Sequence, residues 1–519
     1  MNSHGFLTNR SLARSLKQAH LRNHPIPKST CRSYSLTAAF SGNKTPKKKE
    51  RVVIVGSGWA GYGFARALDP SKYERIIVSP RSYFVFTPLL ASTAVGTLEF
   101  RSVLESIRRL PGPGVDFYQG WADHVDFAAK TIHVEANPTD DLASQTVIPT
   151  PTPTPTPTPR APKGPTVTLP YDKLVIACGA YSQTFNIPGV REHAHFLRDI
   201  GDARRIRLRV LSLFEQCAHP SPTSALTESD RRALLHFAVV GGGPTGIEFA
   251  AELHDLIYED LARLYPALIP LVRITVYDIA PKILPMFDQA LAQYATATFA
   301  RQGIAVRTEH HLTSIRPAAG TTGALALRLK ESGDEDVGAG MVVWSTGLMQ
   351  NPFVRKLEGT KFSLPEDTSE YTLLSAPKTG GITTDAFLRA QITTTTSSDQ
   401  TPRTLPDVFA LGDCATIAAV PTLPKTAQVA SQQAAFLAKH LNDPSRTTKG
   451  FEFRNWGTMT YLGSWKAIHQ SARDELRGWV AWLVWRGAYL TRTLSVRNKV
   501  MVPVYWAVSW VFGRDISRF

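Results

Sequence analysis

The chain has 519 residues, 43% of them hydrophobic, and a formal net charge of +15. This length accommodates two or three domains, each with its own core. The charge lies at the ends: residues 1–49 hold ten Lys or Arg and no acid, and residues 477–519 hold seven against one. The near-neutral body argues against a nucleic-acid-binding protein, and four scattered cysteines predict neither a disulfide framework nor a metal site.

Residues 1–34 are rich in Arg, Ser and Leu and contain no Asp or Glu. They have no apolar stretch of the length found in secretory signals, so the composition is typical of a mitochondrial transit peptide. An ordinary disordered basic tail is the alternative. No stretch of the chain reaches the ~18 apolar residues of a membrane-spanning helix.

The segment 52–68, VVIVGSGWAGYGFARAL, predicts a strand, a tight turn and a helix, and the run at 75–78 predicts a second strand. In the pattern G-x-G-x-x-G, the first glycine permits the turn and the second lets the backbone approach a pyrophosphate. The third glycine permits close packing of helix on strand, and the pattern here is Gly56, Gly58 and Gly61. Ser79 stands where an acid usually contacts the adenosine ribose; its hydroxyl can bond the ribose more weakly.

Residues 114–136 alternate like strands of a sheet, and residues 169–180 return to a buried strand. Between them, proline occupies every second position of 149–159. Proline at this spacing excludes a central strand and favours an extended spacer. We expect an insertion over 137–166 at the tip of a hairpin.

The first pattern recurs at 237–253, FAVVGGGPTGIEFAAEL, with Gly241, Gly243 and Gly246. This second βαβ unit runs from residue 236 to Asp278, whose carboxylate can accept from ribose hydroxyls and repel a 2′-phosphate. Asp278 therefore predicts a preference for NADH over NADPH, and the alternative is that it only begins a turn. The run 341–347 predicts another strand.

The Pro/Thr/Ser-rich stretches 363–379 and 393–404 predict surface loops. Residues 405–415, LPDVFALGDCA, predict a buried strand that delivers Asp413 beside the first glycine motif. The alternative for Asp413 is a plain loop turn. Residues 426–441 predict a helix that carries Gln428 and Gln432 on one face.

Each glycine motif is a candidate cradle for a dinucleotide, and two such cradles predict two dinucleotides. We expect FAD to stay bound on the first cradle as a cofactor and NADH to bind the second as a substrate, with a hydride passing between their rings.

The tail, residues 478–519, holds five of the ten Trp among interspersed cations. That pattern predicts helices lying in a membrane interface. Packing against the chain's own core or at a dimer interface is the alternative.

Eight stretches in this order resemble the type II (alternative, rotenone-insensitive) NADH:ubiquinone oxidoreductases, in particular the fungal mitochondrial branch. Besides the two glycine motifs they include VSPRSYFVFTPLLASTAVGT, LVIACGAYSQTFNIPGV, LPDVFALGDCA, LPKTAQVASQQA and TYLGSWKAI. The resemblance covers about residues 50–519 and implies an α/β fold: two Rossmann-like dinucleotide-binding domains of the disulfide-reductase type, plus C-terminal membrane-anchoring helices.

The resemblance also implies boundaries: an FAD-binding domain over 50–235 and 379–445, an NADH-binding domain over 236–378, and a membrane-anchoring domain over 446–519. It implies a noncovalent FAD, NADH as substrate, and electron transfer to ubiquinone without proton pumping. The partners implied are ubiquinone, the lipid surface of the inner membrane and a second copy in a homodimer. Because no stop-transfer segment follows the transit peptide, we expect the matrix face.

Site residues follow from the same resemblance. The FAD contacts would be Gly56, Gly58, Trp59, Gly61, Ser79, Pro80, Thr87, Pro88, Gly179 and Asp413. The NADH contacts would be Gly241, Gly243, Pro244, Thr245, Gly246, Asp278, Thr346 and Gly347, with Glu248 near the nicotinamide. Quinone would approach Ala427, Gln428 and Gln432. Glu248, Gln428 and Gln432 are the catalytic candidates.

Two alternatives share the plan of two cradles. A sulfide:quinone oxidoreductase needs paired cysteines near the flavin, and Cys178 and Cys414 both end strands of the predicted FAD domain. It would not need an intact second cradle with Asp278. A flavoprotein like apoptosis-inducing factor would carry basic residues on the body of the chain, where the charge is near neutral. For Glu248, a solvated helix face shared with Glu252 is the alternative.

Overall fold

The computed structural model describes residues 48–137, 164–219, 226–320, 323–365, 367–395, 401–471 and 474–518. The predicted transit peptide and the Pro-Thr repeat lie outside the described residues. Every element below lies within residues 49–519, which form one compact unit.

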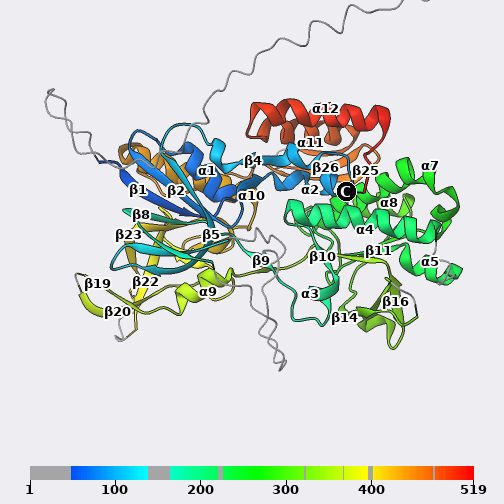
Figure 1. The fold of residues 1–519 in the computed structure, drawn as a ribbon, viewed down its shortest axis with the longest axis horizontal. Helices are drawn as coiled ribbons and strands as arrows, with labels where there is room; N and C mark the ends of the chain where they lie inside the picture. Colours follow the sequence, from blue (N-terminus) through cyan, green and yellow to red (C-terminus); the bar gives the residue numbers. More distant parts are fainter. Residues whose placement is uncertain are drawn as a thin grey trace, which may run out of the picture. The chain divides into compact units, whose positions relative to one another are not determined.

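The largest sheet is built around the first glycine motif (Figure 1). Its five central strands, β23, β8, β1, β2 and β5, run parallel, and antiparallel strands extend both sides. In sheet order the strands are β19 (Phe362–Leu364), β20 (Asp367–Leu373), β22 (Arg389–Thr394), β23 (Arg403–Ala410), β8 (Lys173–Ile176), β1 (Glu50–Val55), β2 (Tyr73–Ser79), β5 (Val115–Asp126), β6 (Thr131–Ala136) and β7 (Thr166–Pro170); β21 (Ile382–Thr384) and β24 (Ala415–Ile417) attach through β22. The predicted order of strand, turn, helix and strand is confirmed, with α1 (Trp59–Ala67) between β1 and β2.

The predicted hairpin around the insertion is also confirmed at its two strands. β6 and β7 pair antiparallel, with Thr131 opposite Pro170 and Glu135 opposite Thr166. The chain between these strands carries the insertion, so the repeat does not interrupt the sheet.

A second sheet, all parallel, is built around the second glycine motif. Its strands, in sheet order, are β10 (His195–Phe196), β17 (Met341–Trp344), β11 (His236–Val240), β12 (Arg273–Tyr277) and β13 (Ile304–Arg307). Helix α6 (Pro244–Asp255) follows β11, as predicted. The remaining described helices of this region are α3 (Val190–His193), α4 (Ile200–Ala218), α5 (Glu228–Leu234), the π-helix η5 (Leu256–Leu261), α7 (Ala262–Leu264), α8 (Gln289–Arg301) and the 3-10 helices η6 (Pro266–Leu271) and η7 (Lys330–Ser332). A small antiparallel sheet consists of β14 (Leu312–Pro317), β15 (Leu325–Leu329) and β16 (Asp336–Ala339).

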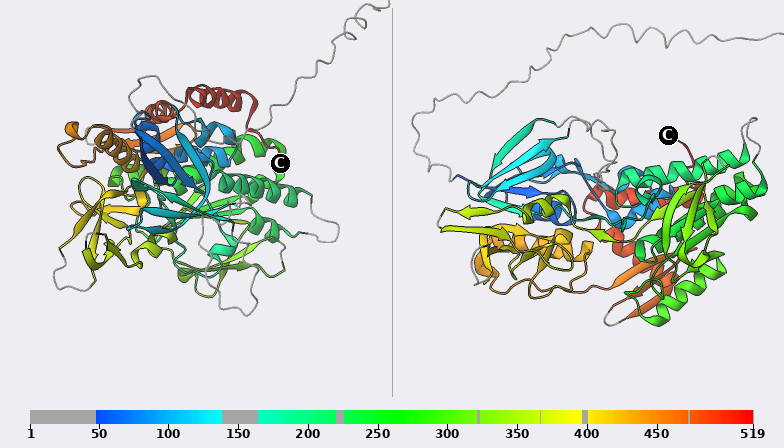
Figure 2. Two further views of the ribbon diagram at one scale, coloured as in Figure 1. Left: turned by 60° about the vertical axis from the view of Figure 1, so that its left-hand side comes forward. Right: turned by 90° about the horizontal axis from the view of Figure 1, so that it is seen from below.

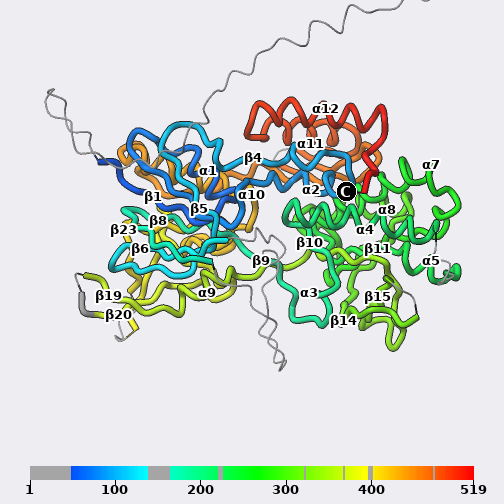
Figure 3. Tube along the Cα trace, viewed as in Figure 1, coloured from blue at the N-terminus to red at the C-terminus, as the bar shows by residue number. Residues whose placement is uncertain are grey.

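The chain passes from the first sheet to the second after β8 and returns after β17. The two crossings pair with each other as β9 (Tyr181–Ser182) and β18 (Leu348–Met349), which can be followed in the trace of Figure 3. The return continues through α9 (Pro352–Glu358) into β19. The two nucleotide-binding units are therefore joined by a short two-stranded connection.

The prediction of a surface loop at 363–379 is wrong, because β19 and β20 occupy much of it and pair within the first sheet. The β-branched Thr and the aromatic Tyr371 favour a strand, although Ser and Pro around them suggest a loop. The chain therefore rejoins the first sheet at β19, before the predicted domain boundary at residue 378.

The C-terminal region forms an antiparallel sheet followed by two helices. The sheet consists of β25 (Thr458–Gly463), β26 (Lys466–Gln470) and β27 (Glu475–Gly478), and the helices are α11 (Trp479–Arg492) and α12 (Val496–Phe512). β25 packs on α6, and α11 packs on β26 and α12 (Figures 1 and 2).

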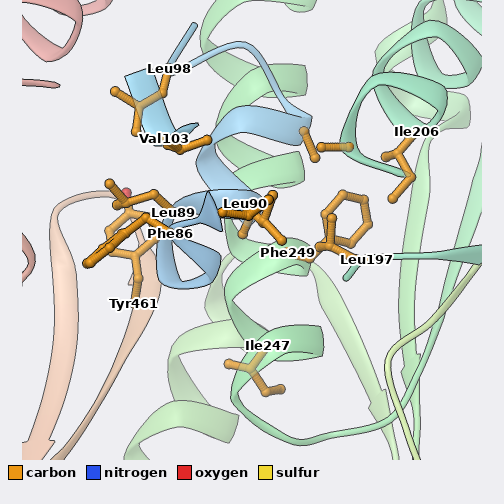
Figure 4. Packing of buried hydrophobic residues seen from close by; sticks show 14 of the residues in the cluster. Phe86, Leu89, Leu90, Leu98, Val103, Leu197, Ile206, Ile247, Phe249 and Tyr461 are labelled. Atoms are coloured by element: carbon orange, nitrogen blue, oxygen red, sulfur yellow. The ribbon is translucent and has the colours of Figure 1, made fainter. Parts of the chain in front are cut away.

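The main core joins these three regions. Phe86 and Leu90, from the first unit, pack with Phe249 of α6 and Tyr461 of β25 (Figure 4). Leu90 lies in α2 (Leu90–Ala94), which follows the short turn η1 (Thr87–Leu89). All four side chains are at most 8% exposed. This shared core fixes the position of the C-terminal region on both nucleotide-binding units.

Candidate functional site

The first cradle has the backbone geometry that its glycines predict. Gly56 follows β1 with φ +111°, and a Cβ there would collide with the carbonyl oxygen of Ala177. A Cβ at Gly61 would collide with the carbonyl oxygen of Gly56. By contrast, nothing lies within 4 Å of a Cβ at Gly58, which is the N-cap of α1. The fold requires the first and third glycines, and the second faces open space at a helix N-terminus, where an anion is stabilised.

The second cradle repeats this geometry. Gly241 has φ +114°, and a Cβ there would lie 2.9 Å from Ser345 Oγ. A Cβ at Gly246 would collide with the carbonyl oxygen of Gly241, whereas a Cβ at Gly243 would meet nothing within 4 Å. Gly243 is the N-cap of α6, and Pro244 is its first residue.

One cleft of about 460 Å³ receives residues from both cradles. Of the predicted FAD contacts it is lined by Gly56, Gly58, Trp59, Ser79, Pro80, Thr87, Gly179 and Asp413. Of the other predicted contacts it is lined by Thr245, Thr346, Gly347 and Ala427. The predicted residues Gly61, Pro88, Gly241, Gly243, Pro244, Gly246, Asp278, Glu248, Gln428 and Gln432 do not line it.

Asp413 is the acidic side chain of this cleft. Burial raises its pKa, and the positive charges of Arg198 and Lys425 oppose that shift. Within the described part of the chain, no protein group hydrogen-bonds to its carboxylate. The neighbouring Gly412 has φ +78° and donates its N–H to Gln433 Oε1 at 2.7 Å. Asp413 is therefore held on a fixed turn with acceptor oxygens left for a ligand.

The strand ends beside the two cradles differ in their polar groups. At the end of β2, Ser79 Oγ lies 2.8 Å from Ser57 Oγ and accepts from Arg81 N at 3.2 Å. After β12, the Asp278 carboxylate accepts from Gly242 N, within the cradle, and from Ala280 N at 2.7 Å. Asp278 therefore contacts the second cradle and also holds the turn after β12. Its predicted contact with the ribose and the alternative, that it only begins a turn, are compatible.

Glu248 is buried between α6 and the C-terminal region, with 8% of its surface exposed. Its Oε1 accepts from Tyr461 N at 3.2 Å and from the Trp485 indole N–H at 3.3 Å. Burial raises the pKa of Glu248 to about 8. The interpretation as a solvated helix face is wrong, because Glu252 is buried as well. Thr245, one helical turn earlier, lines the cleft.

Gln428 and Gln432 share one face of α10 (Ala427–Asn442), as predicted. Gln428 donates to Gly457 O at 3.3 Å and accepts from Trp456 N at 3.2 Å. Gln432 donates to Arg454 O at 2.8 Å and accepts from Arg454 N at 3.0 Å. Both amides are partly buried and tie α10 to the segment that leads into β25, so they are not simply solvent-facing.

Sequence reasoning missed several polar residues at or beside the cleft, among them Arg198, Lys425 and Gln433. Lys425 lines the cleft, and its Nζ donates to Thr416 Oγ1 at 3.1 Å and to the Ala415 carbonyl. Lys425 could have been predicted, because it lies in LPKTAQVASQQA, one of the stretches that resemble the type II enzymes. Nothing local to the sequence marks Arg198, since it reaches the cleft from the loop before α4.

The first cradle and Thr245 of the second line one cleft. This arrangement is typical of an oxidoreductase in which a bound dinucleotide cofactor meets a dinucleotide substrate. Comparison with known proteins gives the same class. Residues 50–434 match the model of the pyridine nucleotide-disulphide oxidoreductases, and residues 456–515 match the NDH2 C-terminal domain.

Curated relatives extend over almost the whole chain. The chain is 35% identical over 478 residues to a probable NADH dehydrogenase of Dictyostelium discoideum, covering 91% of this chain and 92% of that protein. It is 32% identical over 562 residues to an external alternative NAD(P)H-ubiquinone oxidoreductase B1 of Solanum tuberosum mitochondria, with 92% of each covered. An internal A1 form from Arabidopsis thaliana is 33% identical, covering 91% of this chain and 86% of that one.

A solved structure of NDH2 from Plasmodium falciparum in complex with NADH has the same fold, with a TM-score of 0.74 at 23% identity over 91% of this chain and 100% of that one. The chain therefore belongs to the pyridine nucleotide-disulphide oxidoreductases and, among them, to the type II NADH dehydrogenases, or alternative NAD(P)H-ubiquinone oxidoreductases.

Proposed function

We propose that this chain oxidises NADH and reduces ubiquinone through a noncovalent FAD, without pumping protons, on the mitochondrial inner membrane. The observation that carries the proposal is the pair of glycine cradles that contribute to one cleft. Purified protein should oxidise NADH when a soluble quinone is present. If NADH is not oxidised, or if oxidation does not depend on the quinone, the proposal is wrong.

The residues of the first cradle fit a flavin dinucleotide. The open space at Gly58 admits a pyrophosphate at the N-terminus of α1, and Asp413 offers acceptors for ribityl hydroxyls. When bound here, FAD would supply a carrier able to take a hydride from NADH and pass two electrons to quinone. Trp59 lies beside this space, with its indole N–H donating to Thr87 Oγ1 at 2.9 Å. We assign to this cofactor the eight predicted FAD contacts that line the cleft; Gly61 and Pro88 would act only through the backbone around it.

The second cradle would hold NADH. Pyrophosphate would lie at Gly243 and the N-terminus of α6, and the ribose beside Asp278. Thr245, Thr346 and Gly347 reach the shared cleft, which suits a nicotinamide that must approach the flavin. A negative charge at Asp278 supports the preference for NADH over NADPH.

We propose that Glu248 holds a proton between α6 and the C-terminal region, one helical turn from Thr245 of the cleft, because its pKa of about 8 keeps the carboxyl neutral at pH 7. The unfolded chain loses this proton near the ordinary pKa of a Glu, about 4.5, whereas the folded chain keeps it up to about pH 8. The contribution of this carboxyl to the free energy of unfolding therefore falls as pH rises from about 4.5 to about 8. Glu248→Gln keeps the acceptor for Tyr461 and Trp485 and removes this dependence. We expect the variant to melt at the wild-type temperature near pH 5 and above it at about pH 9. Equal pH slopes for variant and wild type, measured by thermal unfolding, would contradict the assignment.

The quinone would approach α10, where Ala427 lines the cleft and Gln428 and Gln432 fix the adjoining segment. Gln428→Leu removes both hydrogen bonds of this amide. We expect reoxidation of the reduced flavin by a ubiquinone analogue to slow about tenfold, for a loss of about 1.4 kcal/mol, with reduction by NADH unchanged. Rapid-mixing absorbance measurements separate the two steps.

Lys439→Ala, on the exposed side of the same helix, is the control and should alter neither step. If Gln428→Leu slows both steps equally, its assignment to the quinone side is wrong.

We further propose that α11 and α12 lie on the lipid surface. No described helix has the length and apolarity needed to span a bilayer. Their outer faces nevertheless expose large apolar side chains, among them Trp479 at 68%, Trp510 at 72% and Phe512 at 82%. The guanidinium carbon Cζ of Arg492 lies 4.0 Å from the ring centroid of Trp456. Trp beside a cation is typical of the membrane interface. An amphipathic surface of this kind binds at the headgroup level.

The doubly substituted variant Trp510→Ser, Phe512→Ser should bind vesicles of phosphatidylcholine and an anionic phospholipid at least tenfold more weakly, since both side chains lose burial in lipid. Leu264→Ser, which changes an exposed apolar residue of α7 (51% exposed), should bind as the wild type does. Co-sedimentation measures this. Unchanged binding of the double variant would exclude α12 from the contact.

The matrix face, the homodimer and the fungal branch stay predictions. The matrix face rests on the lack of a stop-transfer segment after the predicted transit peptide. The curated relatives do not decide it, because they include proteins named external and proteins named internal at closely similar identity. Protease protection of intact mitochondria tests the side of the membrane.

A further inference from the structure

An aromatic residue occupies a strained turn that follows β9. The N–H of Ile187 donates to Thr184 O at 3.1 Å and closes this turn, whose central residues, Phe185 and Asn186, have φ of +53° and +55°. Two consecutive residues at positive φ are typical of a type I′ turn, which favours Gly and Asn. Asn186 fits this preference, whereas positive φ is unfavourable for a bulky residue such as Phe185. The turn therefore does not explain the presence of Phe185.

Burial in the core does not explain Phe185 either, because 54% of this residue is exposed. The fold gains only part of the hydrophobic stabilisation that a buried phenyl ring would give, while the backbone conformation costs free energy. Strained residues of this kind cluster at active sites and at the segments that hold ligands. The combination of strain and exposure therefore indicates that the ring serves a ligand rather than the fold.

The ring of Phe185 lies against residues that line the cleft. A Cβ placed on Gly347 would be 3.0 Å from Phe185 Cε2, and the ring centroids of Phe185 and Trp344 are 6.4 Å apart. Gly347 and Trp344 both line the cleft. The Trp344 indole N–H donates to Gln183 O at 2.9 Å, which ties the start of the turn to the same strand end. Phe185 therefore extends the wall of the cleft beside Gly347 with an apolar ring that water can reach.

This part of the wall belongs to the second cradle. Ser345 Oγ, between Trp344 and Gly347, donates to Val240 O at 3.0 Å and lies 3.2 Å from the carbonyl oxygen of Gly241. In the second sheet, β17 lies on one side of β11 and β12 on the other. Gly347 therefore follows the strand on the side opposite to Asp278, beside which we place the adenosine ribose. A dinucleotide on this cradle would have its nicotinamide half on the side of Phe185.

We propose that Phe185 positions the nicotinamide half of NADH by covering it from water beside Gly347. This inference rests on the proposed function, which assigns NADH to the second cradle. A planar aromatic ring gives a large apolar contact at a small cost in side-chain entropy, which suits the flat nicotinamide. Phe185 should therefore contribute to the affinity for the nicotinamide half of NADH and not to the affinity for its adenosine half.

The test measures the Kd for NADH of the flavin-loaded full chain by anaerobic rapid mixing, from the dependence of flavin bleaching on NADH concentration. Phe185→Gly removes the ring and suits the positive φ, so the variant should fold and keep its flavin. We expect its Kd for NADH to rise at least fivefold, with reoxidation by a ubiquinone analogue unchanged. An unchanged Kd, or an equal loss in the quinone step, would overturn the proposal.

ADP-ribose, which lacks the nicotinamide, separates this role from a structural one. Its inhibition constant against NADH should be the same in Phe185→Gly as in the wild type, because it would bind through the half beside Asp278. If the affinity for ADP-ribose falls as much as the affinity for NADH, the substitution has disturbed the whole cradle and the assignment to the nicotinamide half is wrong.

Two further variants are the controls. Phe185→Tyr keeps an aromatic ring and should bind NADH as the wild type does. Asn186→Gly relieves the other strained position of the turn and leaves the ring in place, so its Kd should also be unchanged. A rise in Kd as large in Asn186→Gly as in Phe185→Gly would assign the effect to the turn and refute a role for the ring. Failure of the proposed function would differ from all of these results, because NADH would then leave the wild-type flavin oxidised.

Discussion

Gly58→Val is expected to give a folded protein that has lost its flavin. The backbone at Gly58 has φ −80° and ψ −164°, which valine adopts readily, and no protein atom lies within 4 Å of the added Cβ. The branched side chain would instead fill the space over the N-terminus of α1 that the pyrophosphate needs. We expect flavin affinity to fall by more than tenfold, a loss of more than about 1.4 kcal/mol, and NADH oxidation to fall with it. Visible flavin absorbance per polypeptide measures the loss.

The same variant distinguishes a cofactor contact from a structural glycine. Because Gly61 has no room for a Cβ beside the Gly56 carbonyl, Gly61→Val should reduce soluble, folded protein as well as flavin. Gly58→Val should retain the far-ultraviolet circular dichroism of the wild type. A yellow Gly58→Val protein with a normal flavin content would show that FAD does not lie at the first cradle.

Gly243→Val is the matched change in the second cradle and should have the complementary effect. Gly243 also has extended backbone, with φ −76° and ψ 176°, and no atom within 4 Å of an added Cβ. The protein should therefore stay folded and yellow. The valine would occupy the place of the NADH pyrophosphate at α6, so the KM for NADH should rise at least tenfold. Steady-state kinetics at saturating quinone measure this effect.

Chemical reduction supplies the control for Gly243→Val. Dithionite should bleach its flavin, and quinone should then reoxidise it at the wild-type rate, because neither step uses the second cradle. If Gly243→Val loses flavin while Gly58→Val keeps it, the assignment of the two cradles must be reversed.

The parts of the fold that follow from local demands could be predicted from the sequence. Gly56 and Gly241 are needed for a positive φ, and Gly61 and Gly246 for close helix packing, so the pattern predicts each strand, turn and helix. The predicted helix from residue 426 begins where Thr426 caps it. The hairpin of β6 and β7 follows from alternation on both sides of the proline repeat.

The parts that depend on distant contacts could not be predicted. The partners of Glu248, at Tyr461 and Trp485, are 213 and 237 positions away, and no local pattern distinguishes this buried acid from a solvated one. The amides of Gln428 and Gln432 meet a backbone segment that has no motif of its own. Strand β20 was not predicted because the Ser and Pro around it suggest a loop, and its pairing with β22 depends on residues distant in the sequence.

Anaerobic absorbance of the purified, yellow protein tests the central claim most directly. One equivalent of NADH should bleach the bound flavin, and a soluble ubiquinone analogue added next should restore the oxidised spectrum. A flavin that NADH leaves oxidised, or a reduced flavin that quinone leaves bleached, would contradict the transfer of electrons from NADH to quinone through this cleft.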